Sequence, residues 1–163
     1  MAVTLPEGDL QSRMERYLEG LRSSHGLQES ELEGDVVRVV VDPESVPAVL
    51  ATARESLGIL HLSFITVVNR EGSFELTYEL LDLRGVRVRV KTTVEGSEPV
   101  VPTVTHIYPT ANWHEREAYD MFGVAFRAHP DLRRIYMWQD HFDHHPLLKN
   151  FEISTKRTFE GLR

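Results

Sequence analysis

Apolar and polar side chains alternate along residues 74–91, and this period of two restricts the segment to β-strands with one buried and one exposed face. Directly opposite residues of an antiparallel pair lie on the same face, so the apolar positions meet only in a register whose paired numbers have an even sum. A three-residue loop at 83–85 satisfies this condition, with Gly85 free to adopt positive φ, whereas a two-residue loop at 84–85 would place valines opposite glutamates. The predicted hairpin places Tyr78 opposite Val90 and Glu79 opposite Arg89. The apolar positions are Phe74, Leu76, Tyr78, Leu80, Val86, Val88 and Val90.

Outside the hairpin, hydrophobic periodicity predicts further elements. Gly58 and Gly123 are placed to end two helices, and Asp42 is a candidate N-cap. Asn112 and Glu115 have the spacing of a capping box. Helices are expected over 9–22, 43–57 and 112–122, strands over 36–41 and 59–68, and loops over 23–34 and 96–102.

Length and composition fit one folded domain, since the chain has 163 residues, of which 41% are hydrophobic and 26% are charged. We predict an α+β fold, with helices packed on a small, mainly antiparallel sheet over residues 1–139 and an extended C-terminal arm over residues 140–163. No apolar run approaches the roughly 20 residues that cross a bilayer. The start of the chain lacks the pattern of a signal peptide, so a cytoplasmic location is expected.

The chain contains no cysteine, which excludes disulfides, thiolate nucleophiles and cysteine-ligated iron–sulfur or zinc sites. The net charge of −7 argues against a general nucleic-acid-binding role.

The helix expected at 112–122 carries charges on two faces. A helical wheel places Glu115 in the apolar stripe, where a carboxylate needs a partner. Arg133 or Arg134 would supply that partner, and the alternative is that Glu115 caps the start of its own helix. The stripe contains Ala111, Glu115, Ala118, Met121 and Phe122, and the opposite face contains Trp113, Arg116, Glu117 and Asp120.

Arg116 and Asp120 have the i,i+4 spacing of a plain surface ion pair. The neighbouring Trp113 favours an interface instead, because tryptophan and arginine are enriched where proteins meet. We expect Trp113, Arg116, Phe126 and the arm to face a partner. On this hypothesis Arg116→Ala weakens assembly and leaves the melting temperature of the isolated chain almost unchanged.

One longer pattern runs without a gap from Glu115 to Tyr136: Glu-Arg-Glu, two residues, Asp, two apolar residues, six residues, His, three residues, Arg, one residue, Ile and Tyr. This pattern resembles the signature of the C-type, 30-kDa peripheral-arm subunit of the respiratory NADH–quinone oxidoreductase (complex I). The residues that the resemblance assigns to the signature or the partner interface are Trp113, Glu115, Arg116, Glu117, Asp120, Met121, Phe122, Gly123, His129, Pro130, Arg133, His145 and Pro146.

The resemblance implies a structural subunit with no catalytic site and no bound cofactor of its own. In such a complex, FMN, iron–sulfur clusters and quinone belong to other subunits, and the whole assembly is the NADH:quinone oxidoreductase and proton translocase. The implied partners are the large hydrogenase-like quinone-site subunit (D type) and the iron–sulfur subunits of B and I type. The implied location is peripheral, on the cytoplasmic side of the cell membrane, with no transmembrane segment in this chain.

The arm departs from the usual respiratory pattern. His-Pro-Leu-Arg-Lys-Asp is common there, whereas this chain has His145-Pro146-Leu147-Leu148-Lys149-Asn150. The resemblance therefore leaves a second branch open, in which the chain is the equivalent subunit of a membrane-bound hydrogenase or of a ferredoxin- or F420-dependent complex.

A histidine cluster gives an alternative from a different class, a small stand-alone metal-dependent hydrolase. Histidines and carboxylates are ligands for zinc or iron. Pro146 prevents a regular ligand helix, however, and a solvated loop is the simpler interpretation. The cluster consists of His141, His144 and His145 with Asp140 and Asp143, to which His129 would add a ligand from elsewhere.

Overall fold

The alternating segment forms the hairpin of β4 (Ser73–Leu81) and β5 (Arg87–Glu95) in the computed structural model, which describes residues 7–24, 27–83, 85–138 and 144–152. The predicted register is confirmed, because Tyr78 pairs with Val90 and Glu79 pairs with Arg89. Gly85 has φ 91°, as the loop requires. On the polar face, Arg89 Nε lies 2.8 Å from Glu79 Oε2.

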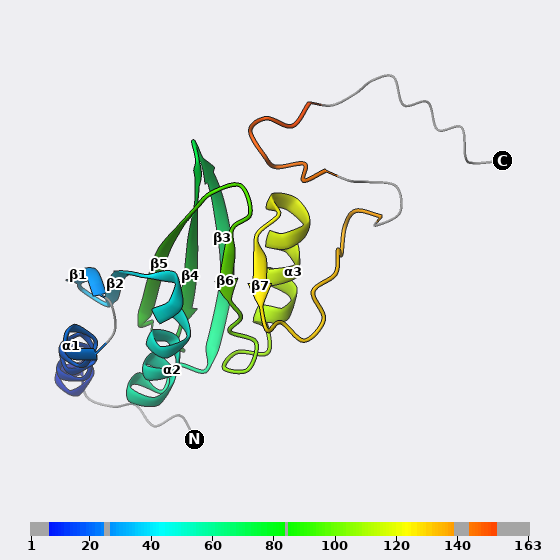
Figure 1. The fold of residues 1–163 in the computed structure, drawn as a ribbon. Coiled ribbons are helices and arrows are strands. Elements are labelled where there is room, and N and C mark those ends of the chain that lie inside the picture. Colours follow the sequence, from blue (N-terminus) through cyan, green and yellow to red (C-terminus); the bar gives the residue numbers. More distant parts are fainter. Residues whose placement is uncertain (1–6, 25–26, 84, 139–143, 153–163) are drawn as a thin grey trace, which may run out of the picture.

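This hairpin is the centre of a mixed sheet with the strand order β1-β2-β5-β4-β3 (Figure 1). The other strands are β1 (Leu27–Glu33), β2 (Val36–Val41) and β3 (His61–Arg70), with β1 and β3 at the two edges. β2 is parallel to β5, and the remaining pairs of this sheet are antiparallel. The prediction of a mainly antiparallel sheet in an α+β fold is therefore confirmed.

Strand β1 lies inside the segment 23–34, where a loop was predicted, so that prediction was wrong. Its acidic sequence has low intrinsic β propensity, and the strand is defined by its pairing with the valine-rich β2. The turn Gly34-Asp35 lies between the paired residues Glu33 and Val36, and Gly34 has φ 58°. A Gly-Asp pair between two strand-like runs is a hairpin signal that could have identified β1.

Helices α1 (Glu7–Ser24) and α2 (Val46–Leu57) pack on each other and on the apolar face of the sheet. The short 3₁₀ turn η1 (Pro43–Ser45) precedes α2, and the Asp42 side chain caps neither element. Instead, Asp42 Oδ1 accepts a hydrogen bond from Gln28 Nε2 at 2.8 Å. Gly58 ends α2 as predicted, with φ 70°.

Helix α3 (Ala111–Phe122) packs against β3 at the other end of the sheet (Figure 1). Strands β6 (Val100–Pro102) and β7 (Ala125–Arg127) pair in parallel and bring the chain before and after α3 together. Each is too short to show periodicity, which explains why residues 96–102 were predicted as a loop. None of the helices in the described ranges is long and apolar enough to cross a membrane.

Candidate functional site: the arm clamp on α3

The signature segment lies on α3 and on the chain that returns beside it after β7 (Figure 1). Gly123 ends α3 as predicted, with φ 78° and its N–H donated to the Tyr119 carbonyl at 2.9 Å. The start of the helix differs from the prediction, because the N-cap is Thr110 and no side chain caps it. Asn112 and Glu115 therefore do not form a capping box.

Glu115 is fully buried, as the helical wheel predicted. Its predicted arginine partners were wrong, because Oε2 accepts a hydrogen bond from Thr103 Oγ1 at 2.5 Å and Oε1 accepts one from the Val104 N–H at 2.8 Å. Burial raises the pKa of Glu115 to about 7, against the lowering effect of these two hydrogen bonds. The carboxyl group is thus an internal titratable group that anchors the chain before α3.

Arg116 is also buried, and its predicted outward position was wrong. Its Nε donates to the Arg133 carbonyl at 3.0 Å and its Nη2 donates to the Arg134 carbonyl at 3.3 Å. Its guanidinium also lies 5.2 Å from the ring centroid of Trp113, whose side chain is 64% exposed as predicted. Arg116 therefore holds the returning chain and supports an exposed tryptophan at the same time.

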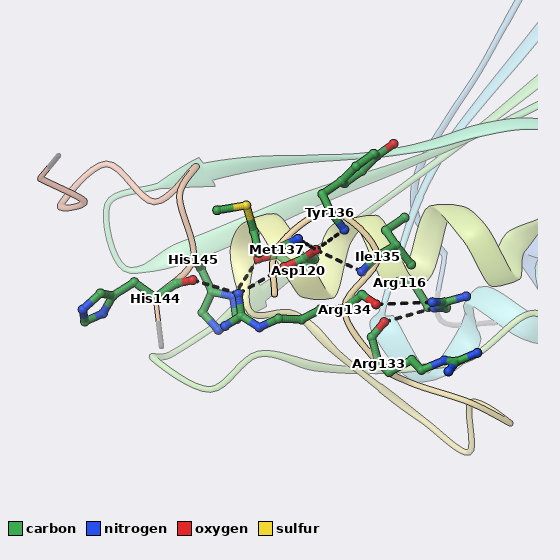
Figure 2. Close-up of polar contacts among 9 residues, drawn as sticks. All are labelled: Arg116, Asp120, Arg133, Arg134, Ile135, Tyr136, Met137, His144 and His145. Carbon is green, nitrogen blue, oxygen red and sulfur yellow. Dashed lines mark hydrogen bonds and ion pairs between the residues drawn. The ribbon is translucent and has the colours of Figure 1, made fainter. Parts of the chain in front are cut away.

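Asp120 is fully buried and is the centre of the polar contacts in Figure 2. Its Oδ2 accepts hydrogen bonds from the consecutive N–H groups of Ile135, Tyr136 and Met137 at 3.0, 2.7 and 2.9 Å. Its Oδ1 lies 3.1 Å from Arg134 Nη1. The wheel placed Asp120 outward because it could not show that the chain at 133–137 covers this face.

The charge of Asp120 is stabilised where it lies. Desolvation on burial works to raise its pKa, but the three backbone N–H groups and the Arg134 guanidinium outweigh that effect and lower the pKa. The aspartate therefore remains ionised and attracts the donors of residues 134–137.

A second segment, from the C-terminal arm, attaches to the same place. The His144 carbonyl accepts a hydrogen bond from Arg134 Nη1 at 3.0 Å, and His145 Nδ1 lies 3.0 Å from the Asp120 carbonyl oxygen (Figure 2). The Leu147 N–H donates to the Met121 carbonyl at 3.0 Å. We call the set Arg116, Asp120, Arg134 and His145 the arm clamp.

Gly123 is required by the arm clamp as well as by the helix end. A Cβ at this position would lie 2.8 Å from Cδ2 of His145, closer than a Cβ atom approaches a neighbouring heavy atom in proteins. The His145 ring also contacts Tyr119 edge-on, with centroids 6.0 Å apart. The glycine thus lets the histidine ring lie directly on the end of α3.

The other signature residues occupy varied positions. Glu117, Met121 and Phe122 line a groove between α3 and β3 that Leu147 of the arm also lines. Pro130 and Arg133 are exposed, and Arg133 Nε pairs with Asp131 Oδ2 at 2.9 Å. Pro146 is half-buried. Phe126, which was expected at the surface, is buried in the core, so that expectation was wrong.

His129 has a fully buried side chain. Its Nδ1 accepts a hydrogen bond from the Asp131 N–H at 3.0 Å, and its Nε2 lies 3.8 Å from Glu115 Oε2. Burial is the largest influence on the pKa of His129 and lowers it. The ring nitrogens of His129 therefore face the Asp131 backbone and the Glu115 carboxylate.

The metal hypothesis depends in part on His141, Asp140 and Asp143, which lie outside the described residues. Among the residues that are described, no three His, Cys, Asp or Glu side chains are grouped so as to hold a metal ion. His145 is already engaged with α3, as described above.

Sequence reasoning missed Thr103 as the partner of Glu115 and Arg134 as the partner of Asp120. Neither pairing has a local signal, because 12 and 14 residues separate the partners.

Three exposed aromatic side chains lie on α3 and on the chain that returns beside it. Trp113 and Tyr136 are each 64% exposed, and Trp138 is 76% exposed. Trp113 lies on α3, and the other two lie on or next to the segment that Asp120 holds. Exposed aromatic residues on a fixed backbone are typical of a protein-docking surface. We call these three residues the aromatic corner.

Comparisons with known proteins agree on one family. The family model described as "Respiratory-chain NADH dehydrogenase, 30 Kd subunit" matches residues 39–157. The chain is 37% identical over 153 residues to the C-type subunit of NADH-quinone oxidoreductase from Methylobacterium sp. (strain 4-46), covering 90% of this chain and 69% of that protein. The matches to several other curated relatives span only 40% to 47% of those proteins.

Two solved structures share the fold. A trypsin-resistant fragment (1-134) of Nqo5 matches with a TM-score of 0.60 and 34% identity, covering 74% of this chain and 99% of that chain. A chain of the membrane-bound sulfane sulfur reductase, an archaeal respiratory membrane complex, matches with a TM-score of 0.70 and 25% identity, covering 85% of each chain.

Proposed function

The chain belongs to the family of the 30-kDa subunit of respiratory-chain NADH dehydrogenase, and from this premise we propose that it is a non-catalytic structural subunit in the peripheral arm of a proton-translocating NADH–quinone oxidoreductase. It docks on the large quinone-site subunit and braces the iron–sulfur subunits, and so supports electron transfer from NADH to quinone. The complex holds it on the cytoplasmic side of the membrane.

The observation that carries the proposal is the aromatic corner on a clamped backbone. Surface tryptophan and tyrosine side chains supply most of the binding energy in many interfaces when their positions are fixed before binding. Arg116 supports Trp113 through a cation–π contact, and Asp120 binds the backbone N–H of Tyr136. The signature thus presents a preorganised surface to a partner.

The residue types of the chain fit a role without redox groups of its own. It has no cysteine to ligate an iron–sulfur cluster. FMN, iron–sulfur clusters and quinone accordingly belong to neighbouring subunits in this proposal. The buried carboxylates Glu115 and Asp120 are engaged in internal hydrogen bonds, which suits a structural role.

The second branch is the equivalent subunit of a membrane-bound hydrogenase or of a ferredoxin- or F420-dependent complex. Two observations favour keeping it. The match to the archaeal sulfane sulfur reductase chain covers 85% of both chains, and the arm has Leu148 and Asn150 where respiratory members commonly have arginine and aspartate.

The test is co-purification of the tagged chain from its native source in mild detergent, with partners identified by mass. We expect the large quinone-site subunit together with an NADH-oxidising module. A nickel-site large chain without that module would select the second branch, and recovery of the chain alone as a monomer would contradict both.

Substitutions in the aromatic corner test whether the partner binds there. Trp113→Ala combined with Tyr136→Ala should reduce recovery of the large subunit while the isolated chain keeps its fold. Leu83→Ala is the control, because Leu83 is a fully exposed apolar side chain on the β4–β5 loop and belongs neither to α3 nor to the segment that Asp120 holds. Equal loss of partners in both variants would contradict docking at the aromatic corner.

A further inference from the structure

Glu115 lies at the inner end of a short chain of hydroxyl groups. Its Oε2 is 2.5 Å from Thr103 Oγ1, which in turn is 3.0 Å from Thr105 Oγ1. Glu115 is fully buried and Thr103 is almost so, whereas Thr105 is only half-buried. The hydroxyls therefore connect a carboxyl group in the core with the surface.

The outer end of this chain opens into a groove. Both threonines line it, together with the prolines Pro47, Pro102, Pro109 and Pro130. We call it the proline groove. His106, Asn112 and Arg127 also line the groove and carry hydrogen-bond donors, and the Arg127 guanidinium is paired with Glu44. Water in the groove can reach Thr105 directly.

The hydroxyl chain can be satisfied in two directions. With Glu115 ionised, Thr105 donates to Thr103, and Thr103 donates to the carboxylate. With Glu115 protonated, its O–H donates to Thr103, and Thr103 donates to Thr105. A hydroxyl is both donor and acceptor, and either threonine can be the donor at the observed geometry. Both protonation states therefore keep the pairs intact.

The histidine beside Glu115 cannot take the proton in its place. His129 Nδ1 accepts the Asp131 N–H, so this nitrogen must be unprotonated and the hydrogen lies on Nε2. A second ring proton would have to bind Nδ1, where it would point at the Asp131 N–H donor and break this hydrogen bond. Burial is the largest influence on the pKa of His129 and lowers it, and the charge of Arg116 acts in the same direction, while the Asn112 backbone and the charge of Asp131 act to raise it without reversing the net lowering. The titrating member of the pair is Glu115.

The remaining titratable neighbour on the sheet side is Tyr78 of β4. Its phenol is fully buried, and burial together with the charge of Glu115 raises its pKa far above the physiological range. Tyr78 therefore stays neutral while Glu115 titrates. Asp131, the other nearby acid, lies at the surface.

We propose that Glu115 is a buried proton-binding site, which exchanges its proton with water in the proline groove through the hydroxyl groups of Thr103 and Thr105. In one uptake event a water-borne acid gives a proton to Thr105 Oγ1, Thr105 gives its own to Thr103, and Thr103 gives its own to Glu115. Each hydroxyl gains and loses one proton, the solution loses one, and the carboxylate becomes a neutral acid. Both protonation states of the carboxyl group keep their hydrogen bonds, so neither is excluded by the surrounding structure.

The experiment follows the assigned side-chain carboxyl carbon of Glu115 by NMR in the full chain, as a function of pH. We expect one titration step near neutral pH, because burial raises the pKa of Glu115 to about 7. A shift that stays at the ionised value down to pH 5 would overturn the site. Because this measurement uses the unmodified protein, it does not depend on whether a Glu115 variant folds.

The route is tested separately by the rate of protonation after a pH jump, observed at the carboxylic-acid infrared band of Glu115. Thr105→Val should leave the midpoint nearly unchanged and slow protonation about tenfold. Thr103→Val should also raise the midpoint, because it removes a hydrogen bond to the carboxylate. Thr93→Val, at an exposed threonine of β5, should change neither quantity. Protonation as fast in Thr105→Val as in the unmodified chain would overturn the hydroxyl route.

Discussion

Asp120 and Arg134 form a buried ion pair, with Oδ1 and Nη1 3.1 Å apart and the two side chains 0% and 9% exposed. The pair joins α3 to the returning chain, and Arg134 continues to the His144 carbonyl of the arm. One acid of the signature therefore connects α3, the returning chain and the arm.

Asp120→Asn should destabilise the chain strongly. The asparagine side chain has one carbonyl oxygen, so it cannot accept hydrogen bonds from both the three backbone N–H groups and the guanidinium, and its NH₂ group must face one of these donors. The substitution also leaves the positive charge of Arg134 without a negative partner. Breaking a buried pair in this way costs about 3–5 kcal/mol of folding free energy. Urea unfolding of the two proteins measures this loss.

Asp131→Asn is the control, since its pair with Arg133 is exposed and should contribute no more than about 1 kcal/mol. Similar losses in the two variants would refute the arm clamp.

The same aspartate predicts how acid affects the fold. Its native pKa is lowered, so its contribution to stability is present above the unfolded pKa of about 3.9 and is lost as the pH falls through the lower native value. The free energy of unfolding should decrease with falling pH in that window, and the slope should be smaller in Asp120→Asn. An unchanged slope in the variant would assign the acid sensitivity to other carboxylates.

Glu115 predicts the opposite dependence. Its native pKa is raised to about 7, above an unfolded value of about 4.3. Its contribution is therefore fully present below the unfolded pKa and is lost as the pH rises through 7. Stability should decline between these values, and Glu115→Gln, which remains neutral, should remove that decline. Chemical unfolding at several pH values measures the free energy of unfolding of the unmodified chain and of Glu115→Gln. If the two plots of this free energy against pH were parallel, the raised pKa of Glu115 would be contradicted.

Arg116→Ala now has a different expected outcome from the one that the helical wheel gave. The side chain is buried and donates to two carbonyl groups, so its removal should lower the melting temperature of the isolated chain. Hydrogen bonds from a charged group contribute about 1.5–3 kcal/mol. Thermal unfolding measures the change, with Arg133→Ala as the exposed control. An unaltered melting temperature would contradict the buried position of Arg116 and its hydrogen bonds to the returning chain.

Gly123→Ala tests the contact between the helix end and His145. The positive φ alone should cost about 1–2 kcal/mol, and the new Cβ would also collide with the His145 ring. In the double variant with His145→Ala, the collision is absent and the effect of φ remains. The double-mutant cycle should therefore show a favourable coupling. Strict additivity would mean that the ring does not lie on Gly123 in solution.

The fold was largely predictable because its local signals are strong. The even-numbered apolar positions of residues 74–91 determine the hairpin register, and Gly58 and Gly123 end their helices where expected. The acidic β1 was missed because its β propensity is low and it is a strand through its hairpin pairing with β2. The short β6 and β7 were missed because each becomes a strand only by pairing with the other across α3.

The site was only partly predictable, for a related reason. A wheel identifies which residues share a helix face, so the burial of Glu115 and the exposure of Trp113 were correct. It cannot show that an irregular segment covers the opposite face. Arg116 and Asp120 were therefore placed outward, although residues 133–137 and the arm cover them.

Amide hydrogen exchange at Ile135, Tyr136 and Met137 tests the central claim most directly. These residues lie outside any helix or strand, so their protection depends on Asp120. We predict slow exchange in the unmodified chain and exchange close to the rate of an open peptide in Asp120→Asn, under conditions where β4 and β5 remain protected in both. Fast exchange at these three amides in the unmodified chain would contradict the account, because Asp120 would then not hold the segment that carries Tyr136.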